Sequence, residues 1–204
     1  MLFLDEAPEF NRGVLDALRQ PLEDGEVRLR RSGGETHYPA RVQLVLAANP
    51  CPCARPEGDQ RCDCSQLVRR RYVGRLSGPL LDRIDVQVKL LPVASSALLS
   101  DLAAEPSTVV AKRVAAAREA ATARWPGGVR NADVSGRTLR ERRWRLPRTV
   151  TGQLARALDH GGLSARGYDR VLKTAWSIAD LDGRARPDAG DVSEALELRK
   201  GTLL

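Results

Sequence analysis

The chain has 204 residues and a formal net charge of +7 at pH 7, with 42% hydrophobic and 29% charged residues. This is an ordinary globular composition that can bury one core and a smaller second one. No run approaches the roughly 20 apolar residues of a membrane helix and no signal-peptide pattern is present, so we expect a cytoplasmic protein rather than a membrane or secreted one.

All but four of the 33 basic residues are arginine. Arginine suits bidentate contacts with phosphate, but a genomic composition bias produces the same excess. The charge therefore makes an anionic partner plausible without predicting nucleic acid by itself.

The first predicted element is an apolar strand that ends in two acids. Residues 1–4 are apolar and are followed directly by Asp5 and Glu6. This pattern is typical of a buried parallel strand that carries carboxylates at its C-terminal end, where open α/β sheets bind ligands. Two adjacent acids suit phosphoryl transfer, since one can hold Mg²⁺ and the other can polarise the attacking water. A strand followed by a solvated acidic turn explains the six residues equally well.

A helix and a hairpin are expected next. The helix should have Asn11 as its N-cap and end at Pro21. Two alternating runs, 26–31 and 35–38, flank Ser-Gly-Gly and predict a β-hairpin. The first strand is basic and carries Arg28, Arg30 and Arg31. We weigh two interpretations equally: contact with nucleic-acid phosphates, and an exposed edge hairpin kept soluble by charge.

A second apolar run, 42–48, predicts another buried strand, and Asn49 follows it. The four cysteines of the chain come next, in one short stretch: Cys51, Cys53, Cys62 and Cys64. In a chain without a secretion signal, such clustering favours a metal site over disulfides. Four thiolates suit a closed tetrahedral Zn²⁺ site, although each pair is C-x-C rather than the more usual wider spacing. The alternative is four reduced thiols in a loop.

The remaining patterns divide the chain into an α/β part, residues 1–94, and an all-helical part, residues 95–204. The α/β part should close with helices over 66–75 and 78–83 and a third strand over 84–91. Predicted helices of the second part are 107–124, capped by Ser107, then 149–160, 164–181 and 188–200.

Three further groups are assigned to structure rather than chemistry. His37 has no companion histidine nearby and is expected at the surface. The six arginines between Arg137 and Arg148 are expected to form a solvated or interface face. The tryptophans, Trp125, Trp144 and Trp176, are expected to pack in a core rather than to stack on bases.

Taken together, these residues resemble a known family. Residues 2–6 (LFLDE) look like a Walker B strand and Asn49 like sensor 1. Residues 77–85 (SGPLLDRID) are similar to the arginine-finger segment of the Mg-chelatase and MCM branch of AAA+ ATPases, and residues 163–168 (LSARGY) resemble its sensor 2. Within that branch, LRQPLEDG at 18–25 and NPCPC at 49–53 match the ComM/YifB subfamily of Mg-chelatase-like proteins, which are associated with competence and DNA branch migration.

The resemblance implies a fold and a set of roles. The fold is a partial AAA+ core with a zinc-binding loop, followed by a helical lid domain with an insertion. Asp5 would ligate the Mg²⁺ of bound ATP, Glu6 would activate the hydrolytic water and Asn49 would orient it. Arg83 would reach a neighbouring subunit's γ-phosphate, and Arg166 would touch the same phosphate from the lid. For either arginine alone, a surface ion pair is the alternative.

The resemblance also implies partners. The parent protein would form a homo-oligomeric ring, expected to be a hexamer, whose hairpins project into a central pore and meet DNA. No G-x-x-x-x-G-K-[ST] motif occurs in the sequence, so we expect a fragment or a truncated reading frame that hydrolyses ATP negligibly alone. Two other interpretations stay open: a magnesium-chelatase motor subunit, against which the four cysteines argue, and a non-catalytic zinc-containing DNA-binding or interaction fragment.

Overall fold

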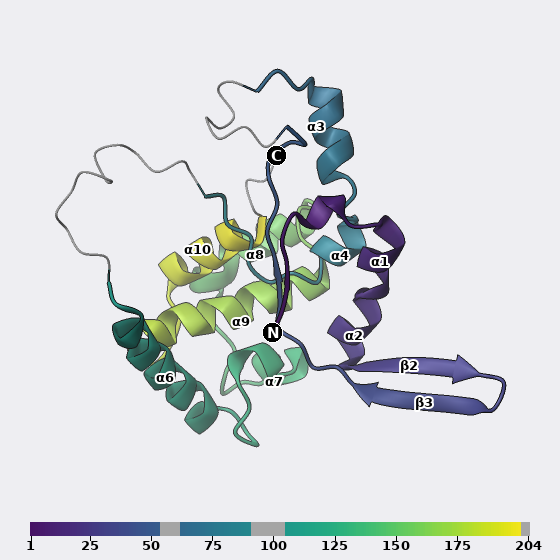
Figure 1. Cartoon of the computed structure of the whole chain (residues 1–204). Helices are drawn as coiled ribbons and strands as arrows, with labels where there is room; N and C mark the ends of the chain where they lie inside the picture. The colour runs from purple at the N-terminus through teal and green to yellow at the C-terminus, as the bar shows by residue number, and fades with distance from the viewer. Residues whose placement is uncertain (54–61, 91–104, 201–204) are drawn as a thin grey trace. The chain divides into compact units, whose positions relative to one another are not determined.

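The computed structural model describes residues 1–53, 62–90 and 105–200 and falls into two compact units (Figure 1). The first unit is Met1–Ile84 and the second is Asp85–Leu204. The boundary predicted near residue 94 lies outside the described residues and stays a prediction. None of the helices in the described ranges combines the length and the apolar composition that a bilayer span requires.

The first unit contains the two predicted strands as a parallel pair. Strand β1 (Leu2–Leu4) pairs with β4 (Leu44–Leu46). Both strands are shorter than predicted, with three residues each. They are also less buried, since Phe3 is 54% and Val45 37% exposed. In the described part of the chain this pair therefore has one open face rather than the two covered faces of a fully buried parallel sheet.

The helices of this unit are short: a 3₁₀ turn η1 (Ala7–Glu9), α1 (Arg12–Ala17), α2 (Arg19–Asp24), α3 (Gln66–Val73) and α4 (Gly78–Leu81). Asn11 caps α1 as predicted, since its side chain accepts a hydrogen bond from the Gly13 N–H at 2.8 Å. The expected stop at Pro21 is wrong. Pro21 lies in the first turn of α2, where the missing N–H would have no helical acceptor. The buried core of this unit is small and consists of Ala7, Leu15, Leu76 and Leu80.

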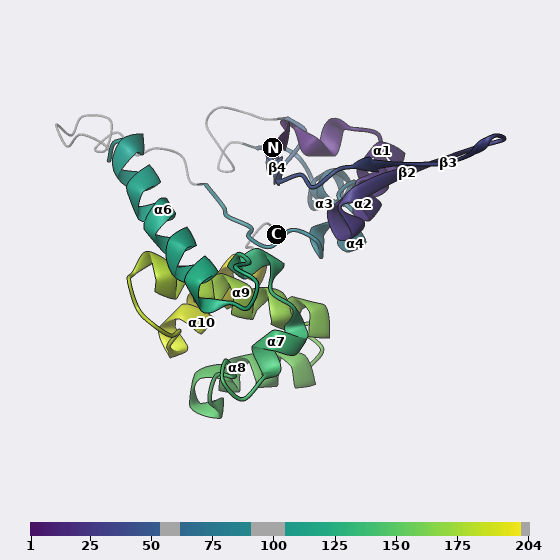
Figure 2. The same cartoon turned by 90° about the horizontal axis from the view of Figure 1, so that it is seen from below.

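The predicted hairpin is confirmed. Strands β2 (Glu26–Arg31) and β3 (Gly34–Pro39) are antiparallel, with Arg28 opposite His37 and Arg31 opposite Gly34. Gly34 has a φ of +140°, a conformation that side chains rarely adopt, at the point where the chain reverses. Figures 1 and 2 show the two strands as a thin ribbon that extends from the end of α2. His37 is exposed, as predicted.

The predicted third strand is wrong for the residues that the structure describes. Residues 84–90 are irregular, and Val86, Val88 and Leu90 are 44%, 57% and 87% exposed. The Gln87 N–H donates instead to the carbonyl oxygen of Leu198 at 2.7 Å. Alternation predicts a strand only where another strand offers a hydrogen-bond ladder, and the described residues offer none here.

The second unit is helical. Its elements are α6 (Ser107–Arg124), the 3₁₀ turn η3 (Asn131–Asp133), α7 (Gly136–Arg140), α8 (Arg148–Asp159), α9 (Ala165–Leu181) and α10 (Ala189–Lys200). The four predicted helices are confirmed to within a residue or two, and α7 was not predicted. Ser107 is the first residue of α6 rather than its cap, which is Pro106. Ser164 does cap α9, accepting from the Gly167 N–H at 3.0 Å.

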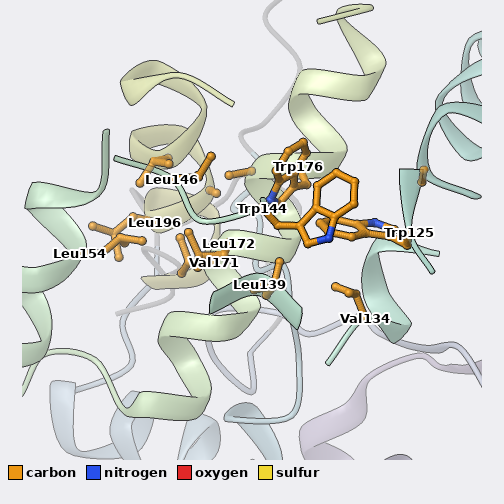
Figure 3. Packing of buried hydrophobic residues seen from close by; sticks show 14 residues of the cluster. Trp125, Val134, Leu139, Trp144, Leu146, Leu154, Val171, Leu172, Trp176 and Leu196 are labelled. Atoms are coloured by element: carbon orange, nitrogen blue, oxygen red, sulfur yellow. The ribbon is translucent and has the colours of Figure 1, made fainter. Parts of the chain in front are cut away.

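The three tryptophans lie together in the core of this unit (Figure 3). The Trp125 ring centroid lies 5.0 Å from that of Trp144 and 5.2 Å from that of Trp176. A polar network lies beside them, in which the buried Arg124–Asp180 ion pair is joined by Asn131. The prediction that the tryptophans pack rather than present themselves to bases is confirmed.

Candidate functional site

Three of the residues expected at the nucleotide, Asp5, Glu6 and Asn49, lie at the same edge of the parallel pair. Leu4 lies opposite Leu46, so Asp5 and Glu6 follow β1 at the edge where Asn49 follows β4. The pairing continues beyond both strands, because the Ala47 N–H donates to the Leu4 carbonyl at 2.9 Å and the Ala7 N–H to the Ala47 carbonyl at 2.8 Å. This is the carboxyl edge of the pair, where α/β proteins bind ligands.

The two acids sit in an unusual turn. Glu6 has a φ of +48° and is the only non-glycine residue with positive φ in the described part of the chain. The Asp5 carboxylate accepts the Glu6 N–H at 2.9 Å, and both side chains are exposed. Backbone strain of this kind is concentrated at functional sites. Two accessible carboxylates and the half-buried Asn49 amide form an oxygen-rich edge that fits Mg²⁺ and a water molecule.

Arg83 follows α4 and is held within its own unit. Its guanidinium forms an ion pair with Glu23 of α2 and donates to the Pro79 carbonyl at 2.7 Å. Only 11% of the side chain is exposed, at a shallow pocket of about 450 Å³ that Arg19 and Asp24 also line. Contact with a phosphate on another molecule would therefore require the carboxylate of Glu23 to be exchanged for that phosphate. Sequence reasoning missed Glu23, and no spacing rule connects it with Arg83.

Arg166 belongs to the second unit. It lies in the first turn of α9 and is exposed. The N-terminal turn of a helix favours negative charge because its N–H groups point outward. Arg166 is thus accessible at the end of a helix whose other end is anchored in the tryptophan core.

The four cysteines converge as predicted. Their sulfur atoms all lie within 4.8 Å of one another. Cys51 Sγ is 3.1 Å from Cys53 Sγ and 3.2 Å from Cys62 Sγ. A tetrahedral site with metal–sulfur bonds of about 2.3 Å has sulfur–sulfur edges of about 3.8 Å, so small shifts would admit the ion. The donor set fits a closed structural zinc site.

The thiols do not have equal acidities. Hydrogen bonds from the Cys51 thiol and from the Cys64 backbone N–H lower the pKa of Cys62 to about 6, and burial raises the pKa of Cys64. Metals bind thiolates, so the lowered pKa of Cys62 favours the form that a metal needs. The Arg69 guanidinium in α3 also contacts the Cys62 carbonyl at 3.4 Å, which ties this loop to the following helix.

The hairpin arginines are partly neutralised. Arg28 Nε lies 2.6 Å from a Glu26 oxygen and Arg30 Nε lies 3.2 Å from a Glu35 oxygen. The Arg28 hydrogen bond is the main cause of the lowered pKa of Glu26. Arg31 is exposed, and no carboxylate pairs with it among the described residues. The alternation places Arg28 and Arg30 on one face, as predicted, but both already contact an acid.

Comparison with known proteins agrees with this geometry. The model for magnesium chelatase subunit ChlI matches residues 1–98, and the model for its C-terminal part matches residues 104–199. The chain belongs to the Mg-chelatase-like family. Within this AAA+-related family it is 42% identical to the competence protein ComM of Haemophilus influenzae over 98% of its length, and 42% identical to YifB of Escherichia coli over 89%. It is also 52% identical to an uncharacterised protein of Mycobacterium tuberculosis over 98% of its length.

Membership confirms the family that the motifs predicted, with its mixed and mostly helical content. The chain spans about 40% of the length of these relatives, from 35% of YifB of E. coli to 40% of the M. tuberculosis protein. The family implies that the parent protein uses a nucleotide and Mg²⁺. The residue roles, the zinc ion, the DNA partner, the ring and the location in the cytoplasm stay predictions.

Proposed function

We propose that this chain is the C-terminal part of an ATP-driven ring motor that acts on DNA. The observation that carries the proposal is the meeting of Asp5, Glu6 and Asn49 at the carboxyl edge of the β1–β4 pair in a chain of the Mg-chelatase-like family. An acid pair and an amide at that edge are what phosphate hydrolysis needs: a metal ligand, a general base and a group that orients water.

Each side chain has one task in this proposal. Asp5 would hold Mg²⁺, which when bound neutralises charge on the nucleotide phosphates. Glu6 would accept a proton from the attacking water, and Asn49 would orient that water by hydrogen bonding. Arg83 would stabilise negative charge on a phosphate held by the adjacent subunit, and Arg166 would bind the same phosphate group from the helical unit.

The pairing of Arg83 with Glu23 supports a role that operates only between subunits. An arginine paired within its own unit is neutralised, so it does not disturb its own nucleotide site. When a neighbour's phosphate approaches, the guanidinium exchanges one anion for another. Arg83 keeps an anion beside it throughout, and the Glu23 side chain is 42% exposed, so water can solvate its carboxylate once it is released. Both features limit the desolvation penalty of the exchange.

The remaining features concern the partner. The four cysteines would hold a structural Zn²⁺ that fixes the start of α3, and Arg28, Arg30 and Arg31 would contact DNA phosphates. Phosphate contact carries no sequence information, so binding should tolerate sequence and weaken steeply with salt. Because Arg28 and Arg30 are paired in the hairpin, each must leave a carboxylate before it binds, and their contribution should be smaller than that of unpaired arginines.

The experiment uses the full-length protein and its rate of ATP hydrolysis. Arg83→Ala and Glu6→Gln should each abolish hydrolysis, and Arg83→Ala should leave nucleotide binding largely intact. A mixture of the two variants should recover part of the rate, since some interfaces then join an intact Arg83 to an intact Glu6. The matched control is Arg75→Ala, which removes an arginine of the same unit that is paired with Glu9 at 3.1 Å and should leave hydrolysis unchanged.

Absence of recovery in variants that co-assemble would contradict the role of Arg83 across the interface. Hydrolysis that persists in Glu6→Gln would contradict the assignment of the base. If ATP is hydrolysed but DNA does not change the rate, a motor of the chelatase type would be favoured instead.

A further inference from the structure

A second basic surface lies in the helical unit, on α7 and the segment that leads to α8. We define it as the 137–148 patch. Its members are exposed arginines: Arg137, Arg142, Arg143, Arg145 and Arg148. Arg186 reaches the patch from another part of the chain, since its Nη2 donates to the Arg143 carbonyl at 2.6 Å. These five arginines lie on one short segment and Arg186 contacts it, and residues 137–148 hold a single acid, Glu141.

The patch differs from six other arginines of this unit in having no acidic partners. Arg113, Arg124, Arg130, Arg140, Arg170 and Arg184 each form an ion pair with a carboxylate. Among the described residues, none of the five patch members has a carboxylate within ion-pair distance. Even Arg140, which lies inside the same stretch of sequence, is neutralised by Asp169. Mutual repulsion of unneutralised guanidinium groups is relieved when a polyanion binds.

The backbone beneath these arginines is fixed. Leu139, Trp144 and Leu146 are 3%, 8% and 8% exposed and belong to the tryptophan core. The N–H groups of Trp144 and Arg145 both donate to the Glu141 carbonyl at 2.9 Å, which closes a turn. Burial alternates from residue 143 to 146, so Arg143 and Arg145 point outward while Trp144 and Leu146 point into the core. A fixed backbone lowers the conformational entropy lost when the arginines bind.

The chemistry of the surface selects its partner. Its large apolar side chains are buried, so it lacks both the apolar face that an interfacial membrane segment inserts and the exposed aromatic anchors of a protein hot spot. Nor is an aromatic ring free to stack on a base, because the ring of Trp144 is buried and lies under the guanidinium of Arg143, 4.6 Å away. What remains is a set of exposed guanidinium groups, whose planar donor geometry matches phosphate oxygens.

We propose that the 137–148 patch binds the phosphate backbone of nucleic acid, as a contact separate from the hairpin. This inference deepens the proposed function by adding a second DNA contact, but it requires neither nucleotide hydrolysis nor a role for Arg28 and Arg30. Binding here should be independent of sequence and steeply dependent on salt.

The test is a salt series of affinities for the 204-residue chain and a short DNA duplex of random sequence, from about 50 to about 200 mM salt. Arg142→Ala with Arg145→Ala should lower the slope of log affinity against log salt by about 1.8, if each arginine neutralises one phosphate. The matched control is Lys112→Ala with Arg118→Ala, which removes two exposed charges of the same unit from α6. The control should leave the slope unchanged.

The hairpin is tested in parallel, so that the two ideas fail separately. A patch variant with the slope and affinity of the unaltered chain overturns the patch, whatever Arg28→Ala with Arg30→Ala does. A hairpin variant without effect removes the hairpin from the proposed function and leaves the patch intact. An unaltered chain that binds no duplex at 50 mM salt overturns both DNA contacts.

Two further measurements separate the outcomes. Equal affinity, at the same salt, for vesicles that contain anionic lipid would show a general attraction to negative charge and would overturn the assignment to nucleic acid. If the double variant does not keep the circular dichroism and melting temperature of the unaltered chain, Arg142→Gln alone is used, and half the change in slope is expected. The double variant Arg142→Lys with Arg145→Lys preserves the charges and should keep most of the slope. If the alanine variant acts through altered packing instead, the lysine variant should show the same change in slope.

Discussion

The two units of this chain are stabilised in different ways. The helical unit buries a cluster of 14 residues that includes three tryptophans, whereas the buried cluster of the α/β unit has four. The α/β unit leaves Phe3 and Val45 of its strand pair partly exposed. Because the hydrophobic contribution to stability grows with the apolar area removed from water, this contribution is larger in the helical unit.

The α/β unit has a small buried cluster and specific polar contacts instead. Its four thiols are poised for a metal, Ser77 joins α4 to Asp16 of α1 with a 2.6 Å hydrogen bond, and Arg83 is paired with Glu23. The unit that we propose to carry out the chemistry is thus the one with the smaller hydrophobic core. Each prediction below tests that contrast, from the largest expected effect to the smallest.

Metal removal should separate the units most clearly. Structural zinc contributes on the order of 10 kcal/mol to small zinc-dependent folds. Protein purified without chelators should contain about one zinc ion per chain, and a strong chelator should abolish the hydrogen-exchange protection of α3 while leaving that of α9 intact. Cys62→Ser should do the same. Protein free of metal, or unchanged metal content in Cys62→Ser, would refute the site.

The tryptophan core gives the next largest effect. Trp176 is 1% exposed, so Trp176→Ala should lower the free energy of unfolding by about 3–5 kcal/mol. Trp176→Phe is the matched control, because the buried Trp176 Nε1–H has no hydrogen-bond partner in the described part of the chain. In Trp176→Phe, removing that unsatisfied donor offsets part of the stability that is lost with the side-chain volume. Urea unfolding monitored by circular dichroism measures the free energy of unfolding of each variant. An equal loss of stability in Trp176→Ala and Trp176→Phe would mean that the indole N–H has a partner.

Serine caps allow a direct comparison of the units. Ser77 caps α4 and also donates to Asp16, whereas Ser164 only caps α9. Ser77→Ala should therefore lower stability by about 2 kcal/mol and Ser164→Ala by about 1. Hydrogen exchange resolved to each helix distinguishes the two. A larger loss in Ser164→Ala would contradict the view that α4 depends on polar contacts.

The smallest effect appears only in acid. Burial alone would raise the pKa of Asp191, but the Arg184 guanidinium and the Asp188 N–H together bring that pKa below its usual 3.8. A carboxyl group with a lowered pKa in the folded state stabilises the fold above pH 3.8, and this contribution is lost as the pH falls through the folded pKa. In Asp191→Asn, the free energy of unfolding of the helical unit should depend less on pH below about pH 4. The same pH dependence in Asp191→Asn and in the unaltered chain would contradict this.

Local patterns in the sequence predicted much of this protein. The helices around Ser164 and Asn11, the hairpin at Gly34, the parallel pair and the cluster of cysteines follow from periodicity, capping and spacing within short stretches. Such signals depend on neighbours a few residues away, and a single sequence contains them. The family could also be predicted, because its motifs are short runs in a fixed order.

Tertiary structure alone decided the features that depend on a distant partner. Residues 84–90 alternate like a strand but have no strand beside them in the described part of the chain. Pro21 lies in the first turn of α2, although a helix was expected to end there. Arg140 is paired with Asp169, whereas Arg142 and Arg145 have no carboxylate partner among the described residues, although the three look alike in the sequence. The physical reason is that the charge and the hydrogen bonding of a side chain depend on what folding places against it, and that partner is often far away along the chain, as Glu23 is from Arg83.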